Sequence, residues 1–359
     1  MGSFETFPEQ EEAKRLLTVA LAEGPAHAYL FHGPRGVGKR AAALAFAGEL
    51  IGAPDRVARE AHPDLYVLEP LGDQIRIDPI RELRRDLHMR PFEADRRVYL
   101  ILGAHLMNED AADALLKDLE EPPEYAVIVL VADELGPIPP TIRSRCQHVP
   151  FRRLSQRAIR EFLAARGVGG AELEALARVA AGRLDRAERL VDPEAGERRA
   201  ALIGLARAVY LDGEFDPVEA ERVVTEFAHR RGAEARAKAE EVGAEETEKQ
   251  REQRAARAAR GAEREQVLDV LDFLSGWYRD LVVVAAGAED AVLNLDRLAV
   301  LAEDAVPERV LAAERAAEAV RESWRVFEEL NVQPGLALEA LFVCLRREFA
   351  GALGAAGKM

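Results

Sequence analysis

The fold of this chain is decided by residues 28–40, which read AYLFHGPRGVGKR. Residues 28–32 form a short apolar run typical of a buried strand, and the Ala-rich residues 39–51 have the pattern of a helix. A glycine-rich turn that ends in Lys39 joins them. A strand, a glycine loop, a lysine and a helix in this order predict a phosphate-binding loop, in which backbone amides face phosphate oxygens. An ordinary glycine turn between a strand and a helix is the simpler alternative.

The candidate nucleotide contacts in this loop are Gly33, Gly36, Gly38 and Lys39. The glycines would let the backbone approach the phosphates, and the lysine would add positive charge. The next residue is Arg40, where a magnesium-dependent loop has Ser or Thr to bind the metal.

A second departure lies at the end of the strand predicted at residues 98–102. At this place a P-loop ATPase carries a pair of carboxylates, one for magnesium and one that activates the attacking water. This chain has Leu102 and Gly103 instead. We therefore expect no ATP hydrolysis by the chain itself, no required cofactor, and at most weak ATP binding at the degenerate loop.

Other apolar runs alternate with helical segments and predict further strands at residues 65–68, 126–131 and 147–151. Strands separated by helices imply an α/β fold with a parallel sheet covered on both faces. From residue 155 onward the pattern is helical only. We divide the chain into an α/β domain at 1–152, a small helical lid at 153–193 and an all-α domain at 194–354.

Composition limits the classes of function. A length of 359 residues suggests about two or three domains, and a net charge of −15 argues against diffuse electrostatic binding to DNA. The cysteines, Cys146 and Cys344, are too few for a four-thiolate zinc site or a disulfide framework. No apolar run reaches the roughly 18 residues of a membrane span. We expect a cytoplasmic protein without zinc and without a membrane partner.

Two charged stretches have no assigned role. Residues 230–262 consist almost wholly of Ala, Glu, Arg, Lys and Gln, which suits an exposed helix, a helical hairpin or a disordered segment. The helix predicted near residues 78–88 carries Arg81, Arg84 and Arg85, which either contact DNA or form a solvated face.

Five stretches together resemble the delta prime subunits of bacterial DNA polymerase III, which are clamp-loader proteins of the AAA+ class. They are residues 28–39, HPDL at 62–65, ALLKDLEEPP at 114–123, IRSRC at 142–146 and NVQPGLALE at 331–339. The resemblance covers nearly the whole chain except the charged insert.

The resemblance implies a RecA-like AAA+ domain, a lid and a helical collar that holds an oligomer together. It implies a hetero-pentamer with gamma/tau ATPase subunits and a delta subunit, which loads the beta sliding clamp onto primed DNA in replication. It also implies a sensor arginine in the lid, for which Arg183 and Arg186 are both candidates. Members of this family commonly bind zinc through four cysteines before HPDL, and residues 49–61 contain no cysteine.

Arg145, in the Ser-Arg-Cys step, is the candidate catalytic residue, acting in trans as an arginine finger on the ATP of a neighbouring subunit. It follows the strand at 126–131 through a proline-rich loop, and we expect it at the nucleotide edge of the sheet. The alternative for Arg145 is a structural ion pair with a carboxylate such as Glu120 or Asp133. For the whole chain, the alternatives are an active gamma/tau-like ATPase and a purely structural scaffold of the loader.

Overall fold

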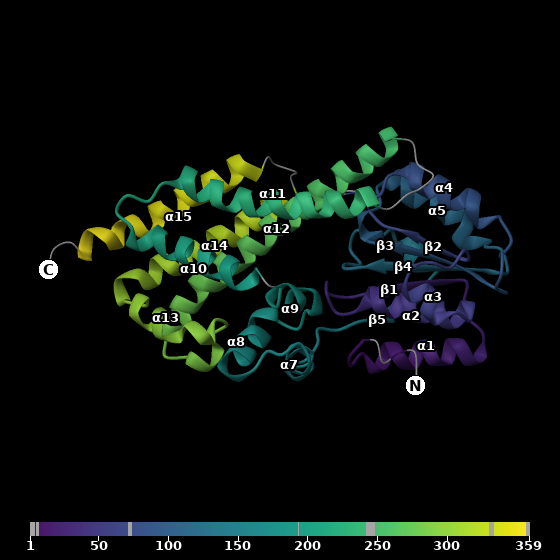
Figure 1. The fold of residues 1–359 in the computed structure, drawn as a ribbon, viewed down its shortest axis with the longest axis horizontal. Coiled ribbons are helices and arrows are strands. Elements are labelled where there is room, and N and C mark those ends of the chain that lie inside the picture. The colour runs from purple at the N-terminus through teal and green to yellow at the C-terminus, as the bar shows by residue number, and fades with distance from the viewer. Residues whose placement is uncertain are drawn as a thin grey trace. The chain divides into compact units, whose positions relative to one another are not determined.

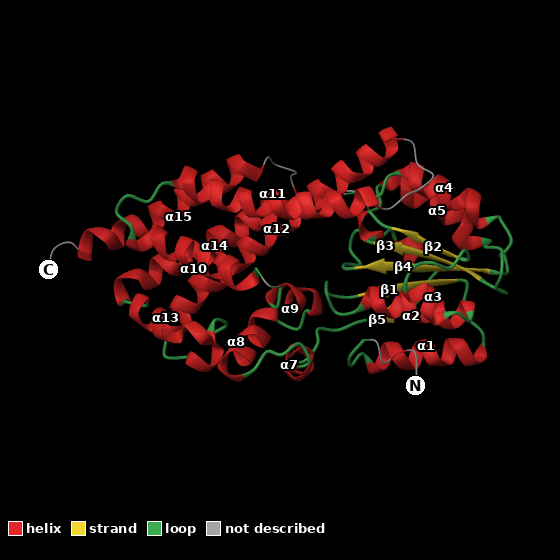
Figure 2. Cartoon of the chain, viewed as in Figure 1, coloured by secondary structure: helices red, strands yellow, loops and turns green. Residues whose placement is uncertain are grey.

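The computed structural model describes residues 4, 7–70, 74–192, 194–241, 248–329 and 334–356. The chain divides into two compact units, the first made of residues 1–162 and 180–187, the second of residues 163–179 and 188–359. Figure 2 shows strands in the first unit and helices in both. The lid predicted at 153–193 contributes residues to each unit, and the three-domain division stays a prediction.

A five-stranded parallel sheet forms the centre of the first unit, in the order β2-β3-β4-β1-β5. Its strands are β1 (Ala28–His32), β2 (Leu65–Leu68), β3 (Arg97–Leu102), β4 (Ala126–Ala132) and β5 (Gln147–Pro150). All five predicted strands are present, and their ends lie within one residue of the prediction. The α/β fold with a parallel sheet is therefore confirmed.

Helices cover both faces of this sheet because its strands alternate buried side chains between two cores. In β3, Val98 and Leu100 face one core, and Tyr99 and Ile101 face the other. The first core is closed by α1 and α2, and the second by α4 and α5 (Figure 1). The helices of this unit are α1 (Glu11–Glu23), α2 (Lys39–Ile51), α3 (Pro54–Ala58), η2 (Ala104–Leu106), α4 (Ile77–Leu87), α5 (Glu109–Glu120) and α6 (Pro140–Arg143).

Short helices connect the units in sequence, and long helices build the second unit. The connecting helices are α7 (Gln156–Ala164), α8 (Gly170–Ala180) and α9 (Leu184–Leu190). The second unit contains α10 (Ala195–Leu211), α11 (Pro217–Glu241), α12 (Glu248–Ala285), η3 (Glu289–Ala291), η4 (Leu295–Arg297), α13 (Leu298–Asp304), α14 (Pro307–Glu329) and α15 (Pro334–Ala356). Helix α12 crosses the core of this unit with the buried side chains of Trp277 and Tyr278.

The charged insert at 230–262 is helical wherever the structure describes it. Its first part continues α11 and its last part begins α12, and these two helices pack against each other. Ala228 and Ala255 are buried, and Gly232 lies against the Glu263 side chain, so small residues let the helices approach closely. The described part of the insert therefore fits the helical hairpin among the three predicted alternatives. Residues 331–333, which begin the collar stretch, lie outside the described residues.

Candidate functional site

The glycine loop predicted to bind phosphate lies between β1 and α2, at the carboxyl edge of the sheet. Gly33, Gly36 and Gly38 have φ values of 142°, 72° and 95°, in the region that L side chains rarely adopt. A Cβ atom at Gly33 would lie only 2.2 Å from the Phe151 carbonyl oxygen. Glycine is therefore required here by backbone conformation and by close packing.

Lys39 is almost fully buried, and its ammonium group is bound within the chain. Its Nζ donates to the carbonyl oxygens of Gly33 and Pro34 at 2.7 and 2.6 Å, and lies 2.8 Å from Asp133 Oδ1. Burial lowers the pKa of Lys39, and the neighbouring Asp133 only partly offsets this. The cation that would contact phosphate is thus paired with a carboxylate of its own chain.

Asp133, directly after β4, belongs to this site, which sequence reasoning missed. Asp133 was considered there only as a partner of Arg145. Its backbone N–H donates to His105 Nδ1 at 3.2 Å, which anchors the backbone beside the lysine. The available signal was its place after the apolar run of β4, because neighbouring parallel strands end at the same edge.

The magnesium positions of an ATPase are occupied differently here. Arg40 pairs with Glu60 at 2.6 Å and also with Glu69, and Gly103 at the end of β3 packs beneath Pro70. The loop amides retain the chemistry to contact phosphate oxygens. These residues do not fit a magnesium-dependent hydrolytic site, because the hydroxyl at position 40 and the carboxylates after β3 are absent.

The segment at 180–187 touches the glycine loop directly. The Leu184 N–H donates to the Gly36 carbonyl oxygen at 2.6 Å. Arg183, one of the two sensor candidates, donates to both oxygens of Asp185, at 3.2 and 2.7 Å. Arg35 Nε lies 3.7 Å from Asp185 Oδ2, so this carboxylate connects the segment to the loop. Charges at the nucleotide edge are largely compensated within the chain.

Arg145 does not lie at the edge of the sheet that carries the glycine loop. The prediction that it would lie at this nucleotide edge was wrong. It stands two residues before β5, whose first residue, Gln147, pairs with Tyr29 near the start of β1. Since β1 and β5 are parallel, Arg145 is at the amino edge of the sheet, whereas the glycine loop is at the carboxyl edge. Between the end of β4 and Arg145, the proline-rich residues 137–140 return the chain to the amino edge. Arg145 therefore does not lie beside the glycine loop, although it follows β4 in the sequence.

The contacts of Arg145 are with the end of α5 and with its own turn. Nη2 donates to Glu120 Oε1 at 2.5 Å, and Nη1 donates to the Thr141 carbonyl oxygen at 2.8 Å. The two side chains of the ion pair are 34% and 49% exposed, so water and other groups can reach them. Glu120 was one of the two carboxylates considered as its partner, and Asp133 binds Lys39 instead.

Two other stretches that carry the resemblance have structural contacts. Asp64, in HPDL, is fully buried and accepts hydrogen bonds from the backbone N–H groups of residues 92–94 at 2.6 to 2.9 Å. Burial would raise the pKa of Asp64, but these donors together lower it below its ordinary value. Asp118, buried on α5, pairs with Arg84 at 2.5 Å, which favours a structural role for that arginine over DNA contact.

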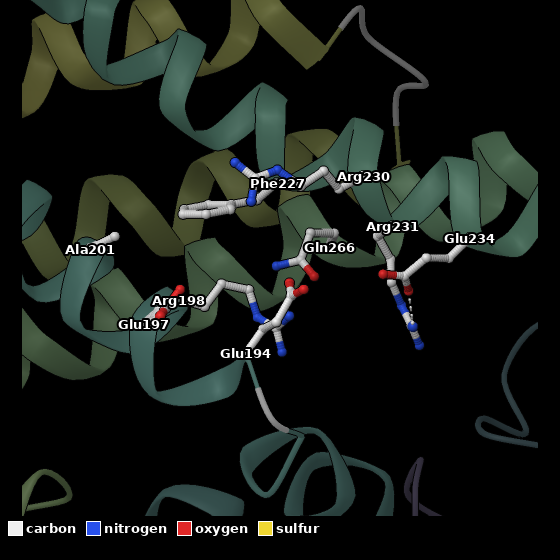
Figure 3. A pocket seen from close by; sticks show the side chains of 9 residues that line it. All are labelled: Glu194, Glu197, Arg198, Ala201, Phe227, Arg230, Arg231, Glu234 and Gln266. Atoms are coloured by element: carbon white, nitrogen blue, oxygen red, sulfur yellow. Dashed lines mark hydrogen bonds and ion pairs between the residues drawn. The ribbon is translucent and has the colours of Figure 1, made fainter.

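A pocket of about 230 Å³ lies in the second unit among α10, α11 and α12 (Figure 3). Gln266 forms part of its wall with an amide that makes no hydrogen bond among the described residues, and Phe227 adds an aromatic ring. Its other lining residues are Glu194, Glu197, Arg198, Ala201, Arg230, Arg231 and Glu234. The balance of arginines and glutamates does not favour a phosphate ligand.

Within the described residues, no group of three or more His, Cys, Asp or Glu side chains is arranged to hold a metal ion. No helix in that part of the chain is long and apolar enough to cross a membrane.

A parallel sheet with a glycine loop after β1, contacted by the segment at 180–187, defines an α/β fold of the P-loop type. Comparison with known proteins gives the relationship more closely. Residues 9–155 match a family model described as "DNA polymerase III, delta subunit". The matched part of the chain is thus similar to the DNA polymerase III subunits that the sequence motifs resemble.

Two named relatives show how far this similarity extends. The chain is 32% identical over 196 residues to DNA polymerase III subunit delta' of Bacillus subtilis, covering 51% of this chain and 60% of that protein. It is 34% identical over 170 residues to subunit tau of the same organism, covering 44% of this chain and 30% of that protein. The chain thus spans less than two thirds of either relative.

A solved structure of a DNA polymerase III gamma subunit-related protein from Thermotoga maritima is similar in fold. It has a TM-score of 0.50 and 17% sequence identity, and the match covers 94% of this chain and 99% of that one. At this identity the likeness concerns the fold alone.

Proposed function

We propose that this chain is the stationary, delta prime-type subunit of a DNA polymerase III clamp loader. With gamma/tau and delta subunits it would form the hetero-pentamer that places the beta sliding clamp on primed DNA. The single observation that carries the stationary role is the buried pair of Lys39 and Asp133 in a loop followed by Arg40. A motor subunit needs that lysine for phosphate and a hydroxyl at position 40 for magnesium.

The overall similarity does not separate this role from that of a gamma/tau-like motor. Identity is 34% to the tau relative and 32% to the delta' relative. The argument therefore rests on particular residues, and the groups absent at position 40 and after β3 support the inactive subunit.

A turnover assay tests this choice. The purified protein is incubated with ATP and magnesium beside its own gamma/tau subunit as a positive control, and phosphate release is measured. We expect no release above that of a Lys39→Ala variant. Steady release that disappears in Lys39→Ala would identify the chain as an active ATPase.

The second part of the proposal is that Arg145 acts in trans on the ATP of a neighbouring motor subunit. Its exposure and its place at the edge opposite its own loop support action outside the chain. Of its N–H donors, Nε–H and one N–H on Nη2 have no partner among the described residues. Two donors on one planar group suit phosphate oxygens, and their charge stabilises phosphoryl transfer.

Replacing Arg145 in the reconstituted loader tests this part. Arg145→Ala should leave assembly intact and lower DNA-stimulated ATP turnover by about tenfold or more at the site it serves, since arginine fingers contribute about 10³–10⁵ in GTPases. Arg145→Lys should recover little because it lacks the planar fork. Arg143→Ala is the matched control on the same turn, where we expect no change.

The specific observation in favour of the scaffold alternative is the ion pair of Arg145 with Glu120. If the assembled Arg145→Ala complex turns over ATP and loads the clamp as the native complex does, the arginine is structural and the chain is a scaffold.

A further inference from the structure

The carboxylate of Glu120 is aligned with Arg145 in a way that the arginine finger alone does not explain. Glu120 is the last residue of α5, and its Oε1 lies 2.5 Å from Nη2. The Thr141 carbonyl oxygen accepts from Nη1 of the same guanidinium at 2.8 Å. Acceptors on both terminal nitrogens fix the plane of the group as well as its position.

Both sides of this contact are built on rigid backbone. On α5, Leu115 and Leu119 are buried in the core beside Glu120. On the other side, Ile142 and Cys146 are buried in the same core and flank Arg145 in sequence. The side chains of the pair are exposed, but the backbone segments that carry them are held by packing.

The remaining donors of Arg145 face no partner among the described residues. Nε–H and one of the two N–H groups on Nη2 are taken by no acceptor among the described residues. A free arginine side chain would have to lose its rotamer freedom when it binds phosphate. An arginine already held by Glu120 and Thr141 has lost much of that freedom beforehand.

We propose that Glu120 is the positioning residue of Arg145, which orients the guanidinium for the phosphate group of a neighbouring subunit's nucleotide. This inference rests on the proposed function of Arg145. Glu120 itself touches no substrate. The exposed pair is weak, because water screens it, so its effect is on orientation.

The test compares Glu120→Ala, Glu120→Gln and a matched control, Glu121→Ala, in the reconstituted loader with clamp and primed DNA. Glu121 is the next residue, it is exposed, and its side chain makes no hydrogen bond or ion pair among the described residues. Glu120→Ala should lower the maximal ATP turnover about three- to tenfold, the size of a typical coupling between contacting residues. The KM for ATP should change little. Glu120→Gln should recover part of the loss, since its amide oxygen still accepts a hydrogen bond.

A double variant, Glu120→Ala with Arg145→Ala, shows whether Glu120 acts through the arginine. We expect no loss beyond that of Arg145→Ala alone. A further loss in the double variant, turnover in Glu120→Ala equal to that in the Glu121→Ala control, or turnover above it, would overturn the inference and leave the arginine finger standing. An unchanged Arg145→Ala complex would overturn the finger, and this inference with it. Thermal unfolding and co-purification with the partner subunits verify that each variant is folded and assembled.

Discussion

Lys39, the first residue of α2, and Arg145, in the turn before β5, are long cationic side chains at opposite edges of the same sheet, and their surroundings differ. The Lys39 side chain is 4% exposed and is held by a carboxylate and two carbonyl oxygens at the carboxyl edge. The Arg145 side chain is 34% exposed at the amino edge and keeps two donors unpartnered by the described residues. The charge of Lys39 is neutralised by a carboxylate of its own chain, whereas the exposed guanidinium of Arg145 is accessible to another molecule.

Physical chemistry explains why the two arrangements differ. A buried charge without a partner is costly, so the buried ammonium group of Lys39 is stabilised by a carboxylate, Asp133. An exposed guanidinium is solvated and can exchange partners at little cost. Four measurements test this difference between the two edges of the sheet.

The largest effect concerns Cys146, which holds the backbone beside Arg145. Burial raises the pKa of its thiol from 9.0 to about 12, so at pH 8 the folded protein should have about a thousandfold less thiolate there than an unfolded chain. Alkylation of Cys146, followed by mass spectrometry, should be slowed to a similar degree. The sign for stability follows: above pH 9 the unfolded thiol ionises first, so stability falls as pH rises toward 12. Rapid alkylation of Cys146 in the native protein would show that the backbone beside Arg145 is not held in the core.

The next effect compares the two ion pairs directly. Asp133→Ala leaves Lys39 buried without its carboxylate and should lower the free energy of unfolding by about 2 kcal/mol, less than for a fully buried pair because Asp133 is 33% exposed. Glu120→Ala, at the exposed pair, should cost less than about 1 kcal/mol. Urea-induced unfolding measures both. Equal losses would contradict the contrast, and Lys39→Met should recover much of the loss in the Asp133→Ala background.

A smaller effect tests the contact between the loop and the segment at 180–187. A Cβ atom at Gly36 would lie 1.7 Å from Asp185 Oδ1 on a backbone with φ of 72°. Gly52 has a similar φ of 79° and nothing within 4 Å, so Gly52→Ala isolates the cost of the backbone conformation, about 1 kcal/mol. Gly36→Ala should destabilise by about 1 kcal/mol more, since the carboxylate must move. Identical unfolding midpoints would show that Asp185 does not hold the loop.

The smallest effect is that of ATP on the pure protein. If the dissociation constant is about 1 mM or weaker, 1 mM ATP stabilises the fold by no more than about 0.4 kcal/mol. The unfolding temperature should therefore change little, with or without magnesium. A large increase in the unfolding temperature that Lys39→Ala abolishes would show that ATP competes with Asp133 for the lysine. The glycine loop would then be a functional nucleotide-binding site.

The order of strands and helices could be predicted from the sequence, because apolar runs, glycines and helix-forming residues act locally. The sequence also showed what is absent, since Arg40 and Gly103 are read directly from their places after the lysine and after β3. The pairing of Lys39 with Asp133, and of Arg145 with Glu120 at the opposite edge, became visible only in the folded structure. The structure also showed that the described insert residues form packed helices. These partners are far apart in the chain, and ion pairs depend on which edge of a sheet each loop reaches, which the folding of the whole unit fixes.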